Sequence, residues 1–391
     1  MRILHTCPVF YPIYGASGSA KVAYEVSKML SSKGHEVLLF STDRALSRSF
    51  LPSEIIRNYN GVRIFQAHRV LPSIFDKQRI YITSHKSILF LKKAIRNSHI
   101  IHIHEYRTLQ NVIIHHFARK YGVPYVLQAH GSLPRIMAWR RLKWVYDVLF
   151  GYRLLRNASK VIALSRVEAQ QYKAMGVPEE KIAIIPNGID LSEYANLPPK
   201  GSFKKKFGIN GDEKIVLYLG RIHESKGLGL LADAFSIVCK DINNVRLVVV
   251  GPDDGYATTF SRRISDLGIR EKVLFTGFVE KRDKLAALID SEVFVTPRFY
   301  GFPVTFLEAC LAGCPIVTTS DELDWIHNNV GYVVESSPIA LAKAISNILR
   351  DEGTRERFRN NCKSAIKNFD ISTIVSQLED TYKSVARRKA G

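Results

Sequence analysis

Short runs of β-branched and aliphatic residues alternate along the chain with longer stretches in which apolar residues recur with a helical period. The short runs predict strands, and the longer stretches predict amphipathic helices. In the first half, strands are expected near 2–6, 36–41, 62–67, 99–104, 124–129, 160–164 and 182–185. Helices are expected near 19–33, 85–96, 109–121, 136–156 and 166–175. This alternation is typical of parallel sheets with helices on both faces.

A second series of the same kind follows the turn-rich segments 186–190 and 198–201. Strands are expected near 214–219, 245–250, 272–276, 292–296, 315–318 and 331–334, with helices near 227–239, 302–312, 340–349 and 355–367. The pattern predicts an α/β chain with two Rossmann-like, doubly wound parallel-sheet domains, residues 1–192 and 193–370. A C-terminal helix over 371–391 either completes the second domain or packs back on the first.

Composition adds a strong positive charge to this picture. The 391 residues include 56 Lys and Arg against 36 Asp and Glu, a formal balance of +20, which favours an anionic partner. Nucleotide, phospholipid, phosphorylated substrate and nucleic acid all fit this charge. The five scattered cysteines form no zinc pattern. No apolar run approaches the roughly 20 residues that cross a bilayer, and no leader is recognisable, so we expect a cytoplasmic protein.

The first glycine-rich turn, 14–19, follows the first expected strand and opens a helix. Its free N–H groups, including those near Gly15, Ser17 and Gly18, favour an anion or a polar ligand. The glycine spacing is not the dinucleotide fingerprint, and no acidic residue closes the second strand, so a nicotinamide cofactor is disfavoured. A plain strand-to-helix turn remains the alternative.

Two cations, Arg221 and Lys226, follow the first strand of the second series. Ligands of open α/β sheets bind at the carboxyl ends of strands. A planar guanidinium and a mobile ammonium there can neutralise the charge that a diphosphate gathers as its bond to a sugar breaks. Two exposed surface cations are the competing interpretation.

A second candidate loop joins an expected strand to the helix near 302–312. The segment Gly301–Val304 would offer free N–H groups to phosphates and sugar. Glu308 lies among apolar neighbours in that helix and needs a partner, for which vicinal ribose hydroxyls are suitable donors. An ion pair within the second domain would satisfy it equally well.

In this order, the segments resemble the GT-B glycosyltransferases of the retaining family often called GT4, or glycosyl transferases group 1. The resemblance covers nearly the whole chain. It is carried by segments 14–18, 34–37, 102–104, 129–131, 185–190, 220–227, 250–251, 275–277 and 308–317. It implies a GT-B fold with two domains that face a central cleft, and a sugar transfer that retains the anomeric configuration.

The resemblance also assigns roles to individual residues. It implies that Arg221 and Lys226 bind the donor diphosphate and that His130 lines the reaction cleft, and these three are the catalytic candidates. Donor binding is expected to involve Gly18, Arg221, Lys226, Tyr300, Gly301, Phe302, Pro303, Val304 and Glu308. Acceptor-side candidates are Gly15, Ser17, His102 and His104. No cofactor or metal is expected, and the nucleotide sugar is a co-substrate.

Two departures from the family pattern concern the part that selects the sugar. Tyr300 replaces the first of two motif glutamates, and a phenol cannot hold two hydroxyls as a carboxylate does. Residues 321–324 replace a glycine pair followed by Pro-Glu. The identity of the sugar and the strength of the activity are therefore the open points.

Two further clusters have competing interpretations. His102, His104 and Glu105, with His130, resemble a metal cluster, because the two histidines share one side of a strand, although a packing or cleft role is favoured. The segment 135–160 carries seven Lys and Arg and one acid, Asp147, around apolar residues with two tryptophans. This helix would either attach peripherally to the inner, anionic face of a membrane or pack its apolar stripe on the first sheet.

The combined expectation is a hexosyl- or N-acetylhexosaminyl-type glycosyltransferase. It would use a UDP- or GDP-sugar and a hydroxyl of a glycan or lipid-linked acceptor, in the assembly of surface polysaccharide, glycolipid or lipid-linked oligosaccharide. The alternatives are a GT-B sugar-nucleotide epimerase or phosphorylase and a basic nucleic-acid-binding protein. The nucleic-acid alternative rests on net charge alone, because no aromatic platform is evident, so no nucleic-acid partner is expected.

Overall fold

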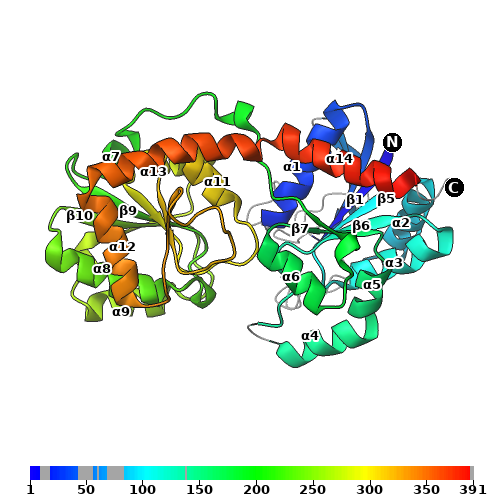
Figure 1. Ribbon diagram of the computed structural model, residues 1–391, viewed down its shortest axis with the longest axis horizontal. Helices are drawn as coiled ribbons and strands as arrows, with labels where there is room; N and C mark the ends of the chain where they lie inside the picture. Colours follow the sequence, from blue (N-terminus) through cyan, green and yellow to red (C-terminus); the bar gives the residue numbers. More distant parts are fainter. Residues whose placement is uncertain (9–17, 43–55, 60, 68–82, 137–138, 388–391) are drawn as a thin grey trace. The chain divides into compact units, whose positions relative to one another are not determined.

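The computed structural model describes residues 1–8, 18–42, 56–59, 61–67, 83–136 and 139–387 (Figure 1). Two compact units make up the chain. The first contains Met1–Gly188 and Ile371–Gly391, and the second contains Ile189–Asp370. The division falls at Gly188, four residues before the boundary expected from the sequence, and the C-terminal segment belongs to the first unit.

The first unit is built on an eight-stranded sheet with the order β3-β4-β2-β1-β5-β6-β7-β8. Its pairs are parallel except for β3 with β4, which is antiparallel. The strands are β1 (Arg2–Cys7), β2 (Glu36–Thr42), β3 (Ile56–Tyr59), β4 (Val62–Ala67), β5 (Ile100–His104), β6 (Tyr125–Gln128), β7 (Lys160–Ala163) and β8 (Ile182–Ile184). The pattern missed β3 because all four of its residues are exposed, which removes the alternation that marks a half-buried strand.

Three helices of the first unit, α2, α3 and α6, begin at side-chain caps. The Ser84, Thr108 and Ser165 side chains each accept a backbone N–H three residues ahead, which satisfies a donor that the helix leaves free. The helices are α1 (Gly18–Ser32), α2 (His85–Asn97), α3 (Leu109–Tyr121), α4 (Arg140–Tyr146), α5 (Tyr152–Asn157), α6 (Arg166–Ala174) and α14 (Ile371–Arg387).

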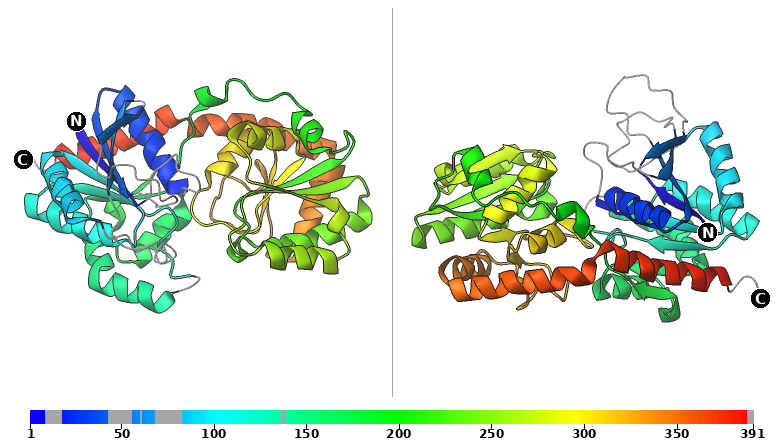
Figure 2. Two further views of the ribbon diagram at one scale, coloured as in Figure 1. Left: turned by 180° about the vertical axis from the view of Figure 1, so that it is seen from behind. Right: turned by 90° about the horizontal axis from the view of Figure 1, so that it is seen from above.

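The C-terminal helix α14 is held against the first unit by polar contacts. Glu379 lies 2.8 Å from Lys33 Nζ and 2.9 Å from His35 Nε2. The Tyr382 hydroxyl and His102 Nδ1 are 2.6 Å apart, and both residues are buried. These contacts fix α14 beside α1 and β5, and Figure 2 shows α14 at the end of the chain in red.

The second unit contains a six-stranded parallel sheet with the order β11-β10-β9-β12-β13-β14. Its strands are β9 (Lys214–Leu219), β10 (Val245–Val250), β11 (Val273–Gly277), β12 (Val293–Val295), β13 (Ile316–Thr318) and β14 (Gly331–Val333). Its helices are α7 (Ser202–Phe207), α8 (Leu228–Asp241), α9 (Ala257–Asp266), α10 (Lys281–Asp290), α11 (Val304–Leu311), α12 (Pro338–Arg350) and α13 (Glu352–Ala365).

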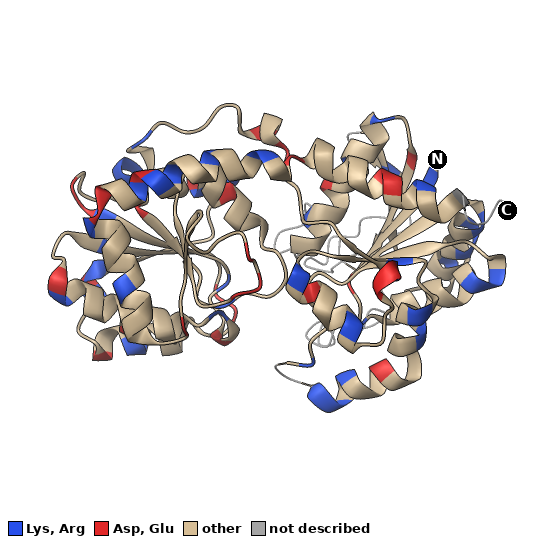
Figure 3. Cartoon of the chain, viewed as in Figure 1, with Lys and Arg blue, Asp and Glu red and all other residues tan. Residues whose placement is uncertain are grey.

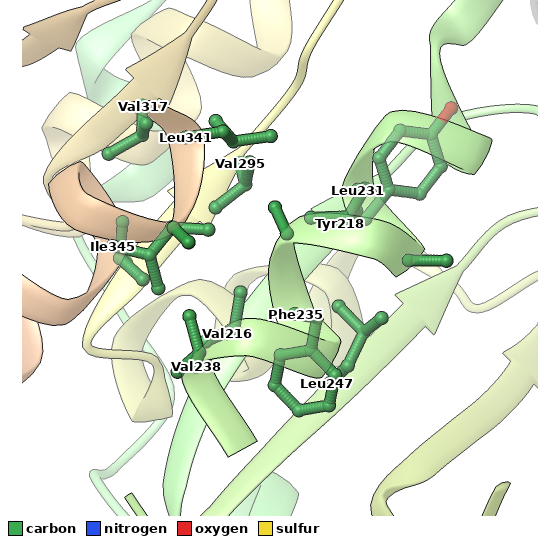
Figure 4. Close-up of a cluster of buried hydrophobic side chains, with 14 of the residues drawn as sticks. Val216, Tyr218, Leu231, Phe235, Val238, Leu247, Val295, Val317, Leu341 and Ile345 are labelled. Carbon is green, nitrogen blue, oxygen red and sulfur yellow. The ribbon is translucent and has the colours of Figure 1, made fainter. Parts of the chain in front are cut away.

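One face of this second sheet packs on α8 and α12. Strand residues such as Val216 and Leu247 meet Phe235 from α8 and Ile345 from α12, and all of them are fully buried (Figure 4). Burial of a large apolar side chain contributes about 1.5–3 kcal/mol. This core fixes the strand ends on which the candidate loops are mounted. All five cysteines are free thiols, and four of them are buried.

The prediction of a single α-helix over 136–156 is wrong. The helix α4 starts at Arg140, a five-residue π-helical segment spans Asp147–Gly151, and α5 follows. Asp147 is fully buried and bonds Arg107 and Arg135, so the extra residue in the turn draws this carboxylate inward. Periodicity could not reveal this, because the pairing is with residues outside the helix.

Candidate functional site

Both sheets contain a topological switch point. In the second unit, β9 lies between β10 and β12, so the connections after β9 and β12 leave the sheet in opposite directions. Ligands of open α/β sheets bind beside such divergent loops, at the carboxyl ends of the strands. Arg221 and Lys226 follow β9, and the segment 300–304 follows β12. A hydrogen bond of 3.3 Å from Arg298 N to Lys226 O joins the two loops.

Arg221 is carried by a tight turn after β9. Gly220 has φ +154, and its carbonyl oxygen lies so close to Gly251 that a side chain on Gly251 would overlap it. The guanidinium is 59% exposed and forms an ion pair with Asp254. Asp253, beside it, accepts the N–H groups of Gly255, Tyr256 and Ala257, so this carboxylate stabilises the turn that leads into α9.

Lys226 lies in a short 3₁₀ turn, Glu224–Lys226, ahead of α8. Burial lowers its pKa, and the positive charge of Arg221 lowers it further, while Glu322 opposes the shift. The two cations therefore act on each other through space. A partly buried ammonium beside a guanidinium is poised to bind an anion, because the anion relieves their repulsion.

The loop after β12 presents a backbone donor to a carboxylate. Gly301 has φ +73, which favours glycine, and its N–H donates to Glu322 Oε2 at 2.6 Å. Pro303 is the N-cap residue of α11, and Val304 begins the helix. Phe302 is buried and packs on Trp325 and Phe369, which anchors the loop. Tyr300 is 37% exposed.

Glu308 is paired inside the second unit, as the alternative interpretation held. It is 1% exposed, lies 2.7 Å from Lys284 Nζ and accepts the Tyr194 hydroxyl at 3.2 Å. The ammonium and the phenol offset the cost of burying this carboxylate. The sequence pattern did not indicate Lys284, Tyr194 or Glu322, because all three contacts join separate elements.

In the first unit, three imidazoles form a hydrogen-bonded row. His5 Nδ1 lies 3.0 Å from His104 Nε2, and His104 Nδ1 lies 2.9 Å from His130 Nε2. Burial lowers the pKa of His5 to about 3 and that of His130 to about 4, and it lowers the pKa of His104 well below its usual range. The sequence analysis did not select His5, because only the pairing of β1 with β5 brings this residue next to the other histidines.

The ligand nitrogens of His5, His102 and His104 lie within 4.8 Å of one another, as in a metal site, but the orientation of two of the rings does not suit a shared ion. The His102 and His104 rings are stacked, with centroids 4.1 Å apart and an interplanar angle of 23°. Nitrogen lone pairs lie in the ring plane, so those of stacked rings run side by side instead of converging on one ion. The arrangement fits packing and hydrogen bonding of neutral rings.

Carboxylates support the backbone around these histidines. His130 has φ +54, Gly131 has φ +75, and the Gly131 N–H donates to Glu168 at 2.6 Å. Burial raises the pKa of Glu168 to about 7, against the lowering effect of its two backbone donors. Glu105 accepts the Ser19 hydroxyl at 2.6 Å, next to Gly18, the first residue of α1. Gly15 and Ser17 lie outside the described residues.

The segment from 139 to 152 exposes large apolar side chains. These are Trp139, Leu142, Trp144, Val145, Val148, Leu149, Phe150 and Tyr152. We call this set the α4–α5 face. Lys and Arg lie along the same two helices (Figure 3). The expectation that this stripe packs on the sheet is wrong for these residues, because buried Asp147 turns the opposite side of the segment inward.

Two family models match this chain. Glycosyl transferases group 1 matches residues 199–365, and Glycosyltransferase Family 4 matches residues 16–193. Together with the two parallel-sheet units, these matches show that the chain belongs to the group 1 glycosyltransferases of family 4 and has the GT-B fold. Within the ranges that the structure describes, no helix is long and apolar enough to cross a membrane.

Some relatives match nearly the whole chain and others match part of it. An uncharacterised glycosyltransferase, MJ1607, of Methanocaldococcus jannaschii is 26% identical and covers 95% of this chain and 96% of its own. A phosphatidyl-myo-inositol mannosyltransferase of Mycobacterium leprae is 30% identical over 52% of this chain and 53% of its own. The Anabaena protein Alr3699/HepE in complex with UDP-glucose superposes with a TM-score of 0.76 at 20% identity, covering 98% and 100% of the two chains.

Proposed function

We propose that this glycosyltransferase moves a sugar from a nucleotide-diphosphate sugar to a hydroxyl group of a glycan or lipid-linked acceptor. The donor is UDP- or GDP-linked. The observation that carries the proposal is the meeting of Arg221, Lys226 and the Gly301 N–H at the switch point of the second sheet. Two cations and a backbone donor, which Glu322 occupies in this structure, form an anion site without a metal.

Each donor group has a residue suited to it. Arg221 is exposed and can form two parallel hydrogen bonds to phosphate oxygens, while Lys226 supplies a mobile charge. Glu308 is the ribose ligand in this proposal, and Lys284 and Tyr194 hold its carboxylate through Oε1. The backbone from Gly301 to Val304 and the Tyr300 phenol face the sugar. Gly18, at the start of α1, is a separate donor-binding candidate on the first unit.

The proposed transfer retains the anomeric configuration and uses the departing phosphate as the base. His130 is a weak base, because burial lowers its pKa to about 4. It therefore acts as a neutral hydrogen-bonding group on the acceptor side. His102 and His104 are fully buried, so they support that side from within, whereas Gly15 and Ser17 are candidates for direct contact. No cofactor is required.

The acceptor proposal is supported by a relative. A protein named for mannosyl transfer to phosphatidyl-myo-inositol is 30% identical over about half of this chain. An acceptor of this kind lies at a membrane surface, and this chain carries a face suited to such a surface. We therefore favour an acceptor with a lipid carrier. A sugar of hexosyl or N-acetylhexosaminyl type fits the same family.

The α4–α5 face is the proposed attachment site for an anionic membrane. It combines exposed Trp139 and Trp144 with cations of the same segment, Arg140, Arg141 and Lys143. Aromatic rings at the headgroup level and flanking cations are what interfacial helices use. A net charge of +20 adds long-range attraction to acidic lipids. Attachment on the inner face of the membrane would bring lipid-linked acceptors to the first unit.

Flotation with vesicles tests the attachment. The full chain should float with vesicles rich in acidic lipid at low salt and less at high salt. The double variant Trp139→Ser, Trp144→Ser should lose flotation, whereas Leu89→Ser, which removes an exposed apolar residue from α2, should retain it. Equal flotation of both variants, or none by the unaltered chain, would exclude this face as the attachment site.

Hydrolysis of donors without an acceptor tests the transfer itself. UDP-, GDP- and ADP-linked hexoses and N-acetylhexosamines would be incubated with the full chain, and release of the nucleoside diphosphate would be measured. One nucleotide and one sugar class should be hydrolysed clearly above the others. Product anomeric configuration, read by NMR with an accepted lipid or glycan, should match that of the donor. An inverted product would overturn the proposed retaining mechanism.

A further inference from the structure

The row of three histidines in the first unit has a definite inner and outer end. His5 lies in the middle of β1 and is fully buried, as is His104 at the end of β5. His130, beyond the end of β6, is only partly buried. The row therefore runs from the interior of the sheet to its carboxyl edge, where the proposed function places the acceptor side.

Neutral imidazoles restrict how protons can be arranged in such a row. A neutral ring has one N–H donor and one lone pair, and burial keeps all three rings neutral. Each of the two N···N hydrogen bonds needs one proton. The three rings can satisfy both bonds in only two ways, with every N–H pointing outward or every N–H pointing inward.

The inner end decides between these two arrangements. His5 Nε2 is buried and has no hydrogen-bond partner among the residues that the structure describes. The inward arrangement would place an N–H on this atom, whereas the outward arrangement leaves only a lone pair. Buried N–H groups without an acceptor are rare in folded proteins. The outward arrangement therefore has the lower free energy. It places the proton of the last ring, His130, on Nδ1.

We propose that His5 and His104 are positioning residues that fix His130 as the Nδ1–H tautomer, so that it presents a hydrogen-bond donor at the carboxyl edge of the first sheet. His104 donates to His130 Nε2, and that nitrogen is then closed to substrate. The left-handed backbone of His130 and the bond from Gly131 N–H to Glu168 hold the ring in place. The predicted effect on turnover rests on the proposed function, whereas the predicted tautomer of His130 does not.

Long-range ¹H–¹⁵N NMR of histidine-labelled protein reads the tautomer directly. In the full chain at neutral pH, His130, assigned with a His130→Gln variant, should show a protonated Nδ1 and an unprotonated Nε2. His104→Leu, which removes the donor, should shift His130 toward the Nε2–H form. His104→Asn, whose amide can donate from the same position, should preserve Nδ1–H. A protonated Nε2 in the unaltered chain, or no shift in His104→Leu, would overturn the proposal.

Turnover gives a second readout that a purely structural role would not produce. With a donor that the chain hydrolyses or transfers, His104→Leu should lower kcat about 10- to 100-fold, as loss of an orienting partner typically does, while the donor KM stays unchanged. His104→Asn should recover part of kcat. Equal losses in both variants would contradict the tautomer role. If NMR finds the tautomer but no donor is turned over, the proposed function fails and the proton arrangement stands.

Discussion

The carboxylate of Glu308, on α11, lies 2.7 Å from the ammonium of Lys284, on α10. The carboxylate is buried, while the lysine side chain is 24% exposed. The pair therefore joins two helices and also leaves the lysine near the surface. The sequence analysis selected Glu308 as a ribose ligand. Its pairing with Lys284 shows how the buried negative charge is stabilised when no ribose is bound.

Replacement of Lys284 should lower the stability of the fold, because the buried charge of Glu308 then has no cation beside it. Lys284→Met leaves Glu308 without its cation and should lower the free energy of unfolding by about 3 kcal/mol, as does breaking a buried pair. Lys206→Met is the matched control, because Lys206 and Asp283 form a more exposed pair worth less than about 1 kcal/mol. Urea unfolding measures both, and equal effects would show that Glu308 does not depend on Lys284.

Glu322 puts a negative charge where the proposed diphosphate binds. It accepts the Gly301 N–H and acts electrostatically on Lys226. Glu322→Gln keeps an acceptor for Gly301 and removes the charge, so UDP or GDP should bind about fivefold more tightly, or about 1 kcal/mol. Glu271→Gln, at the amino end of β11, should have no effect. Weaker binding by Glu322→Gln, measured by calorimetry, would show instead that its charge supports the site.

The contacts of Glu379 predict a dependence on pH. Hydrogen bonds from Lys33, opposed by burial and assisted by His35, lower the pKa of Glu379 from 4.5 to about 2. A lowered native pKa contributes stability that is present above pH 4.5 and lost as the pH falls toward 2. The difference in unfolding midpoint between the unaltered chain and Glu379→Gln should follow that course. Glu179→Gln, at an exposed site, should show no such trend.

Asp147 should be essential to the α4–α5 segment. It is fully buried between Arg107 and Arg135, and Asp147→Asn leaves both cations without their charge partner. Breaking such a pair costs about 3–5 kcal/mol. Hydrogen exchange should therefore increase across 140–157, and flotation with vesicles should decrease. Asp266→Asn, at an exposed position, is the control. Unchanged exchange in Asp147→Asn would show that other contacts hold the segment.

The sequence predicted those parts of the candidate site that follow directly from strand order. Arg221 follows β9 and Gly301 lies in the loop after β12, and the carboxyl ends of parallel strands share an edge, so the placement of both loops at this edge followed from position alone. Burial of Glu308 likewise followed from its apolar neighbours. The matches to two family models confirm the family that these segments resemble.

Contacts between distant elements could not be predicted in the same way. His5 joins the histidine row because β1 pairs with β5 in a register that sets it opposite His102. Asp147 turns inward because Arg107, forty residues earlier, meets it. Neither position differs in its local pattern from an ordinary strand or helix residue. Register and long-range pairing are tertiary properties, and a single sequence gives little access to them.

Calorimetric titration of the full chain with UDP and GDP tests the central claim most directly. One of the two should bind with a stoichiometry of one, and a single-stranded oligonucleotide should not compete at physiological salt. Lys226→Ala should weaken binding at least tenfold, about 1.4 kcal/mol, and Lys240→Ala, on the same unit at the end of α8, should not. Equal affinity of Lys226→Ala and the unaltered chain for the nucleotide would contradict the proposed donor site.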